Sequence, residues 1–433
     1  MDEPASRHDP YAALRDPEYS AFLVSRAFGG LGGSMLGPVI GWELYQRTHR
    51  PMTLAWVGLV QALPIFLFAL HAGHVADTRS RKRVAVAGQC VTTAAALALM
   101  ALSMAHAPVP LYFLCLFVLT TAGAFSNPAR QALVRQIVPT ERMPNAISWN
   151  TTVFRVAAVV GAALGGWIVA VTHQPAAVYA ITSALAVVSV LLMGRVTNRP
   201  PPPGTRERAT WNTLLAGIRY ISETRIILAT ITLDLVAVLL GGATTLLPVY
   251  AKDILHVGAA GFGLLESAPS AGALVTALAL THFPPFKYPG RAMLWAVGGF
   301  GLATIAFGLS RSMPLSLFML FLTGALDMIS VVVRSSLVQT LTPQEMQGRV
   351  SAVNSVFITT SNEVGGFESG VVAQYTSPLF SVVSGGIGTL LTVVLTAYKW
   401  PTVRRYVAGS MEEEPRERAA AGYPEEQETK AEK

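Results

Sequence analysis

The residues of this chain that could do chemistry are charged side chains inside long apolar segments. They are Arg26, Arg155, Asp234, Glu266, Asp327 and Glu363. A charge held in hydrocarbon costs several kcal/mol unless it is paired or hydrated, so each of these positions is a candidate functional site. Because desolvation favours the neutral form of a carboxylate, an acidic residue at that depth can take up a proton and release it where it meets water.

Asp234 is the first candidate for such proton exchange. It lies about eight residues from the inner end of its segment, which is roughly 12 Å along a helix, and Arg26 has a similar depth in the first segment. Either side chain could meet a substrate. A structural salt bridge that holds one conformation is the alternative role for Asp234, and the residues leave both roles open.

Asp327 and Arg334 share one helical segment. Their spacing places them on the same face but roughly 10 Å apart along the axis, too far to pair directly. Asp327 is a second candidate proton carrier. For Arg334 we favour a gate or a contact with lipid phosphate.

Segment 350–373 is unusually polar, with Glu363 and Glu368 in the run 361–370. Such a run must face protein or water, and the two carboxylates point to different faces, so one can line a cavity while the other pairs elsewhere. In segment 147–171, Gly161, Gly165 and Gly166 indicate close packing of helices.

The composition places these residues in a membrane. With 52% hydrophobic residues, 13% charged residues and a mean hydropathy of +0.46, the chain is too apolar for a soluble globular protein. A span needs about 20 apolar residues, which gives about twelve spans. Their expected limits are 18–42, 52–72, 84–105, 110–129, 147–171, 175–194, 226–249, 259–281, 291–309, 314–335, 350–373 and 378–399.

The distribution of basic residues predicts the orientation. Lys and Arg concentrate on the side that holds both termini, whereas Arg47, Arg50, Lys252 and Arg311 fall on the other. Both termini are therefore expected in the cytoplasm. The net charge of +7 favours contact with lipid phosphates and gives no reason to invoke nucleic acid. Cys90 and Cys115 fall inside spans and suggest neither a disulfide nor a metal site.

The chain divides into two halves. Four consecutive prolines at 200–203 cannot continue a helix. The predicted organisation is a cytoplasmic segment 1–17, a six-helix bundle 18–199, a linker 200–225, a second six-helix bundle 226–400 and a disordered tail 401–433. Within the linker, Trp211, Leu214, Leu215 and Ile218 indicate an amphipathic helix, either on the membrane surface or in a soluble linker.

An internal repeat supports the two halves. Arg130, Glu141 and Asn150 recur in the second half as Arg334, Glu345 and Asn354, within a run of matching apolar residues and prolines. Two such repeats are expected to rock around one central site. We also predict a short cytoplasmic helix after the fourth and tenth spans, because Pro343 and Glu345 are typical of a helix start.

The loop between the second and third spans identifies a family. Gly73, Asp77, Arg81 and Lys82 resemble the gating motif between helices two and three of the major facilitator superfamily, although Thr78 and Ser80 depart from it. Gly73 is expected to allow close approach of the eleventh span. The run 161–166 resembles the superfamily's antiporter motif, with Ala162 in place of Pro. In the second half, Leu233-Asp234-Leu235, Gly348–Asn354 and Ser361-Asn362-Glu363 are similar to the enterobactin-exporter branch.

The resemblance implies the major facilitator fold, an all-α membrane protein with twelve transmembrane helices in two pseudo-symmetric bundles. It places Arg26, Asp234 and Asp327 in helices that line the central cavity, and Arg155, Glu266 and Glu363 in helices that join the halves; Arg130, Arg334 and Glu368 are further charge or gate candidates. It implies a proton-coupled exporter of a small amphipathic compound, such as a siderophore or drug. The expected protein acts as a monomer in lipid of the bacterial inner membrane and needs no cofactor beyond the proton gradient.

Two alternatives remain. One is an importer of a small anionic metabolite, with Arg26 holding its anionic group. The other is a membrane receptor or enzyme on the same fold. An enzyme would need a nucleophile, a metal cluster or a phosphate-binding loop, and no such set converges in this sequence.

Overall fold

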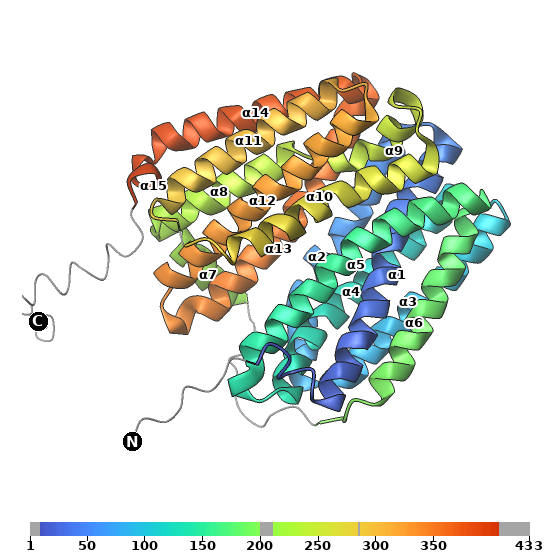
Figure 1. Ribbon diagram of the computed structural model, residues 1–433, viewed down its shortest axis with the longest axis horizontal. Helices are drawn as coiled ribbons and strands as arrows, with labels where there is room; N and C mark the ends of the chain where they lie inside the picture. Colours follow the sequence, from blue (N-terminus) through green and yellow to red (C-terminus); the bar gives the residue numbers. More distant parts are fainter. Residues whose placement is uncertain (1–8, 200–210, 285, 407–433) are drawn as a thin grey trace, which may run out of the picture.

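A computed structural model of the protein describes residues 9–199, 211–284 and 286–406, and all regular secondary structure in those residues is helical. Residues 200–210 and 407–433, which include the first part of the predicted linker and most of the predicted tail, lie outside the described part. Figure 1 shows two bundles of long helices side by side.

The first bundle contains six long helices. Many begin with proline at the first or second helical position, where a missing N–H costs nothing, and Asp16 accepts hydrogen bonds from the first turn of α1. The helices are α1 (Pro17–Thr48), α2 (Pro51–Thr78), α3 (Arg81–Met104), α4 (Val109–Ile137), α5 (Met143–Thr172) and α6 (Pro175–Gly194).

The second bundle follows the short helix α7 (Trp211–Glu223). Its long helices are α8 (Arg225–Leu240), α10 (Gly258–Leu280), α11 (Pro289–Leu309), α12 (Met313–Leu341), α13 (Gln344–Tyr375) and α14 (Pro378–Lys399). A broken connection links α8 to α10 through the 3₁₀ turn η2 (Ala243–Leu246), the short helix α9 (Leu247–Val249) and the π-helical turn η3 (Tyr250–Ile254).

The predicted span 226–249 is therefore interrupted. The regular helix ends at Leu240, and at Gly242 the chain passes so close to α13 that an added Cβ would lie 2.6 Å from the carbonyl oxygen of Gly365. Glycine is required at this approach because any side chain would displace the α13 backbone. The segment keeps its predicted position and loses its helical continuity.

The helices are long and apolar enough to cross a bilayer. Ten segments meet that description among the described residues. The two long helices outside that set are α1 and α13, each 32 residues, which carry the polar side chains discussed below. With them, the protein is an all-α membrane protein of two six-helix bundles, as the sequence predicts.

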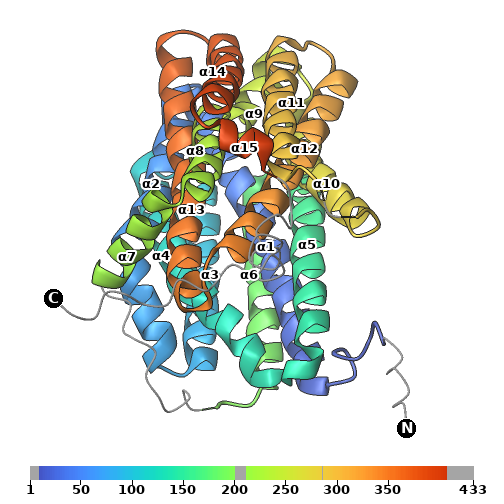
Figure 2. The same ribbon diagram turned by 90° about the vertical axis from the view of Figure 1, so that its left-hand side faces the viewer.

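The two ends of the bundles are distinguished by the chain termini. We call the end that holds Asp9 and Tyr406 the terminal face, and the opposite end, where α1 meets α2, the distal face. Figure 2 views the molecule from the side on which α7 and α15 lie in Figure 1. The predicted orientation would place the terminal face in the cytoplasm.

The halves share a core only toward the distal face, within the described residues. One hydrophobic cluster there combines first-half residues such as Ile40 and Leu44 with second-half residues such as Tyr250 and Phe262. Toward the terminal face each half has its own clusters. In Figure 1, α5 and α10 accordingly lie together near the distal face and diverge toward the terminal face.

Three predicted boundaries need correction. The expected short helix after α4 is a single 3₁₀ turn, Thr140–Arg142, that runs directly into α5. After α12 the residues expected to form such a helix are the first turn of α13, which Pro343 caps. The tail begins with a helix, α15 (Pro401–Arg405), because Val403 is buried against α11.

The helix predicted in the linker is present as α7. Tyr220 donates a hydrogen bond to the carbonyl oxygen of Leu341 at 2.7 Å, and Ile221 is buried in a cluster with α8 and α13. Leu215 and Ile218 remain 57% and 42% exposed. The apolar side of α7 is thus only partly covered by protein, which is consistent with a helix at a membrane surface.

Candidate functional site

The centre of the second half contains a buried ion pair between α8 and α12. The guanidinium of Arg334 contacts the carboxylate of Asp234, and both residues are buried. The hydroxyl of Ser330 donates a further hydrogen bond to Asp234 at 3.0 Å. Arg334 therefore points into the bundle, and the predicted contact with lipid phosphate is wrong. The structural salt bridge considered for Asp234 is present.

Asp327 lies on the same helix, at the midpoint of α12. It makes no hydrogen bond or ion pair with any residue that the structure describes. It is within electrostatic reach of Asp234 and Arg334 in its own half and of Arg155 on α5 in the other half. The separation predicted between Asp327 and Arg334 is consistent with this arrangement, and Asp327 is an acidic group within electrostatic reach of charges in both halves.

The first half presents basic groups at comparable depth. Arg26 on α1 lies with its Cζ atom 5.9 Å from the ring centroid of Phe154. Arg130 on α4 donates a hydrogen bond to the side-chain oxygen of Gln89 on α3 at 3.0 Å. The two arginines are within electrostatic reach of each other. Arg26 and Arg130 thus place two positive charges close to each other inside the first half.

Two further carboxylates, Glu266 on α10 and Glu363 on α13, lie on helices that join the halves. Neither side chain has a hydrogen bond or ion pair within the described residues. The backbone oxygen of Glu363 would lie 2.7 Å from a Cβ added at Gly58 of α2, so α13 and α2 are in close contact there. Glu368, nearer the distal face, accepts a hydrogen bond from Ser369 at 3.3 Å.

The loop motif stabilises the first half at the terminal face. Arg81 donates to the carbonyl oxygen of Ala132 in α4 at 3.1 Å, and Lys82 donates to the carbonyl oxygens of Gly194 and Val196 at the end of α6. The bonds of Lys82 satisfy carbonyls that the end of α6 leaves free. Asp77 belongs to α2, but its side chain lies outside the described part.

The close approach expected at Gly73 is not made. A Cβ added there would meet nothing within 4 Å, and the same holds for Gly348 near the start of α13. Instead, α2 and α13 pack through Gly58 and Gly370, toward the distal face. A contact at Gly73 would need the terminal ends of the halves to come together.

The glycines of α5 pack on two partners. A Cβ at Gly161 would lie 2.7 Å from the Cβ of Ser34 in α1, and one at Gly165 would lie 3.3 Å from the carbonyl oxygen of Met35. At Gly166 the neighbour is Gly263 of α10, in the other half. On α1, a Cβ added at Gly33 would meet nothing within 4 Å.

The distal ends of the halves are joined by contacts that the sequence did not reveal. Tyr45 on α1 donates a hydrogen bond to Asp253 of η3, and Lys252 donates to the side-chain oxygen of Gln46 at 2.6 Å. Trp42 stacks on Phe262 of α10 with ring centroids 5.1 Å apart. These contacts close the distal face.

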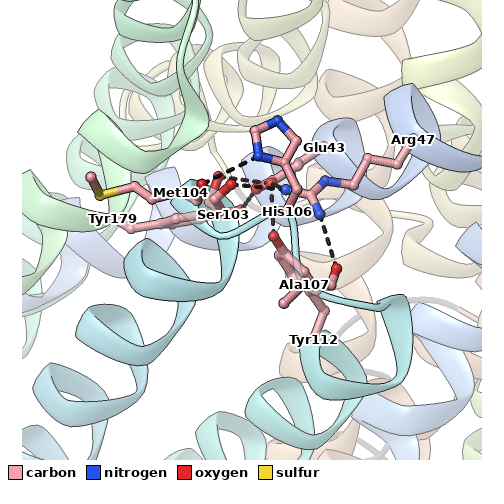
Figure 3. A network of polar contacts seen from close by, with 8 residues as sticks. All are labelled: Glu43, Arg47, Ser103, Met104, His106, Ala107, Tyr112 and Tyr179. Atoms are coloured by element: carbon pink, nitrogen blue, oxygen red, sulfur yellow. Dashed lines mark hydrogen bonds and ion pairs between the residues drawn. The ribbon is translucent and has the colours of Figure 1, made fainter.

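A second feature missed from the sequence is a buried polar cluster around Glu43 of α1, drawn in Figure 3. Its carboxylate forms an ion pair with Arg47 at 2.5 Å and accepts hydrogen bonds from Tyr112 at 2.9 Å, Tyr179 at 2.6 Å and Ser103 at 2.8 Å. Four helices, α1, α3, α4 and α6, thereby meet at one side chain. Glu43 was overlooked because the predicted span ended at residue 42, whereas α1 continues to Thr48.

Removing the Glu43 carboxylate is expected to destabilise the fold. In Glu43→Ala the buried hydroxyls of Tyr112 and Tyr179 lose their acceptor, at about 1–3 kcal/mol each. The melting temperature of the purified protein should fall clearly. Glu223→Ala is the matched control, because its ion pair with Arg219 is exposed and contributes at most about 1 kcal/mol. Equal melting temperatures for both variants would contradict a structural role for the cluster.

A cavity of about 910 Å³ adjoins this cluster at the distal face. Glu43 and Arg47 line it from α1, His106 and His173 from the turns after α3 and α5, and Ala259 from the start of α10. Trp42 and Gln46, which take part in the contacts that join the halves, also line it.

The helical architecture and the intramembrane charges define a membrane transporter of the major facilitator type. The model of the transmembrane secretion effector family matches residues 8–419. The chain belongs to this family.

Individual relatives agree with that assignment. The enterobactin exporter EntS of Citrobacter koseri is 26% identical over 395 residues, which cover 90% of this chain and 93% of that protein. A crystal structure of a POT family transporter in complex with 5-aminolevulinic acid has a TM-score of 0.68 at 12% identity, covering 89% of this chain and 96% of that one. The nucleoside transporter NupG has a TM-score of 0.67 at 15% identity, covering 90% and 100%. At these identities the two solved structures show the fold alone.

Proposed function

We propose that this protein is a proton-coupled exporter of a small amphipathic compound that works by alternating access. The observation that carries the proposal is Asp327. It is an acidic side chain at the midpoint of a membrane helix, without a partner in the described residues, and it faces charges of both halves. A carboxylate in that position can be neutral when buried and charged when hydrated, so its protonation can follow the conformation.

The direction and the cargo are inferred from the relatives. The similar curated proteins are named as enterobactin exporters, so a siderophore or a drug of similar amphipathic character is the proposed class of cargo. The protein would lie in the bacterial inner membrane with its terminal face in the cytoplasm, because that face carries the excess of Lys and Arg.

Alternating access is supported by the distribution of contacts. The common hydrophobic cluster and the Tyr45–Asp253 contact join the halves toward the distal face, while separate clusters occupy the terminal ends. In the proposed orientation this is a state closed to the outside. Export would require the opposite state, in which Gly73 and Gly348 come into contact.

Everted membrane vesicles test this function. In these vesicles an exporter accumulates its substrate when respiration acidifies the lumen. We expect radiolabelled enterobactin, or a drug found by a thermal-shift screen, to accumulate and to leak out after a protonophore is added. Accumulation only in right-side-out vesicles would instead support the importer. Accumulation that a protonophore leaves unchanged would exclude proton coupling.

A further inference from the structure

Arg26 and Arg130 form a pair of like charges inside the first half. Gln89 connects them: its side-chain oxygen accepts the hydrogen bond of Arg130, and a Cβ added at Gly29, one turn after Arg26, would lie 3.2 Å from that same oxygen. The arginines come from α1 and α4, and each lies about 10–14 Å from the terminal end of its helix.

Neither arginine has a counter-ion. No carboxylate in the described part of the chain forms an ion pair with Arg26 or Arg130, and the Nε atom of Arg26 is buried without an acceptor. Both residues are partly buried. Unpaired charges held away from water are costly, and two of the same sign add mutual repulsion. A bound anion would remove both penalties at once.

The internal repeat provides a comparison within the same molecule. Arg334 is the counterpart of Arg130, and in the second half α8 supplies the carboxylate of Asp234 to neutralise it. In the first half the repeat places Gly30 of α1 at the position of Asp234, with Arg26 one turn earlier, so α1 supplies no carboxylate there. The second half therefore completes its ion pair internally, whereas the first half leaves the place of the carboxylate open.

The aromatic side chain of Phe154 lies next to Arg26. The ring of Phe154 lies against Arg26 and is 55% exposed, although it belongs to a helix within the bundle. An exposed ring next to an arginine suits a ligand that combines an acidic group with an aromatic or other flat apolar part.

We propose that Arg26 and Arg130 bind the anionic group of the transported compound and that Phe154 packs on its aromatic part. The cargo would thus be an aromatic acid, or a larger molecule that carries an acidic aromatic group. This inference rests on the proposed transport function for the role of the ligand, while the binding site itself can be tested without transport.

Binding to purified protein in a non-ionic detergent is the direct test. The probes are 1-naphthoate and 1-naphthamide, which share their ring system and differ in charge, and the measurement is calorimetric titration. We expect naphthoate to bind at least about tenfold more tightly than the amide, with an affinity that falls as salt is added. In Arg26→Gln and Arg130→Gln this preference should be lost. Arg219→Gln, in an exposed ion pair of α7, is the control that should retain it.

Arg26→Asp separates binding from folding. It replaces one of the two like charges with a carboxylate one turn from the position of Asp234 in the repeat, so the variant should melt no lower than the original protein and yet bind no naphthoate. Equal affinity for acid and amide, or undiminished naphthoate binding in Arg26→Asp, would overturn the proposal. Binding of dihexanoyl phosphatidylglycerol at this site without any binding of naphthoate would also overturn it, because the anion would then be a lipid headgroup.

The vesicle assay distinguishes failure of this inference from failure of the proposed function. Proton-driven export of a compound by vesicles containing Arg26→Asp would support the exporter and reject the anion site. Charge-selective binding without any proton-driven export would support the site and reject the exporter.

Discussion

Asp327→Asn is expected to reduce proton-driven accumulation in everted vesicles to the level of vesicles that lack the protein. The asparagine keeps the size of the side chain and cannot exchange a proton, so the cargo and the gradient become uncoupled. Because Asp327 has no hydrogen bond or ion pair in the described residues, its replacement breaks no contact there, and the variant should fold with an unchanged melting temperature.

Exchange of labelled for unlabelled cargo without a gradient is the second measurement on Asp327→Asn. It needs the conformational change and no net proton movement, so it should continue, and its rate should lose any dependence on pH that is due to this carboxylate. Glu223→Gln, an exposed substitution on α7, should retain both activities. Gradient-driven accumulation by Asp327→Asn would contradict the assignment of the proton site.

The fold could be predicted closely because the thickness of the bilayer sets a similar minimum length for every helix that spans it. The limits 175–194 and 378–399 are reproduced by α6 and α14, each of which begins at a proline. The interruption of α8 was not predictable in the same way. It depends on how closely Gly242 approaches α13, and apolar composition alone does not record such a contact.

The sequence indicated the individual residues of the site, but it did not indicate which of them contact each other. Asp234 and Arg334 stand out as charges in apolar segments, but they meet only because α8 packs on α12, a contact between residues far apart in the chain. Glu43 was not among the predicted residues because it follows the last residue of the expected span 18–42. The open space at Gly73 depends on how the terminal ends of the two halves sit relative to each other, and the residue pattern of one loop does not specify that arrangement.

The Asp234–Arg334 pair is expected to show the largest effect on stability. Asp234→Asn leaves the guanidinium of Arg334 buried without a counter-ion, which typically costs about 3–5 kcal/mol. The melting temperature of the purified variant, measured by loss of monodisperse protein after heating, should fall strongly. Arg334→Gln should behave in the same way, because it leaves the carboxylate of Asp234 alone.

The double variant Asp234→Asn with Arg334→Gln distinguishes the two roles left open for Asp234. It removes both charges, so most of the lost stability should return, as it would not if the single substitutions acted independently. If the ion pair only stabilises one conformation, the double variant should still couple accumulation to the gradient through Asp327. A stable double variant that exchanges cargo but no longer accumulates it would assign Asp234 to proton transfer as well. A melting temperature for Asp234→Asn equal to that of the original protein would show that the ion pair does not stabilise the second half.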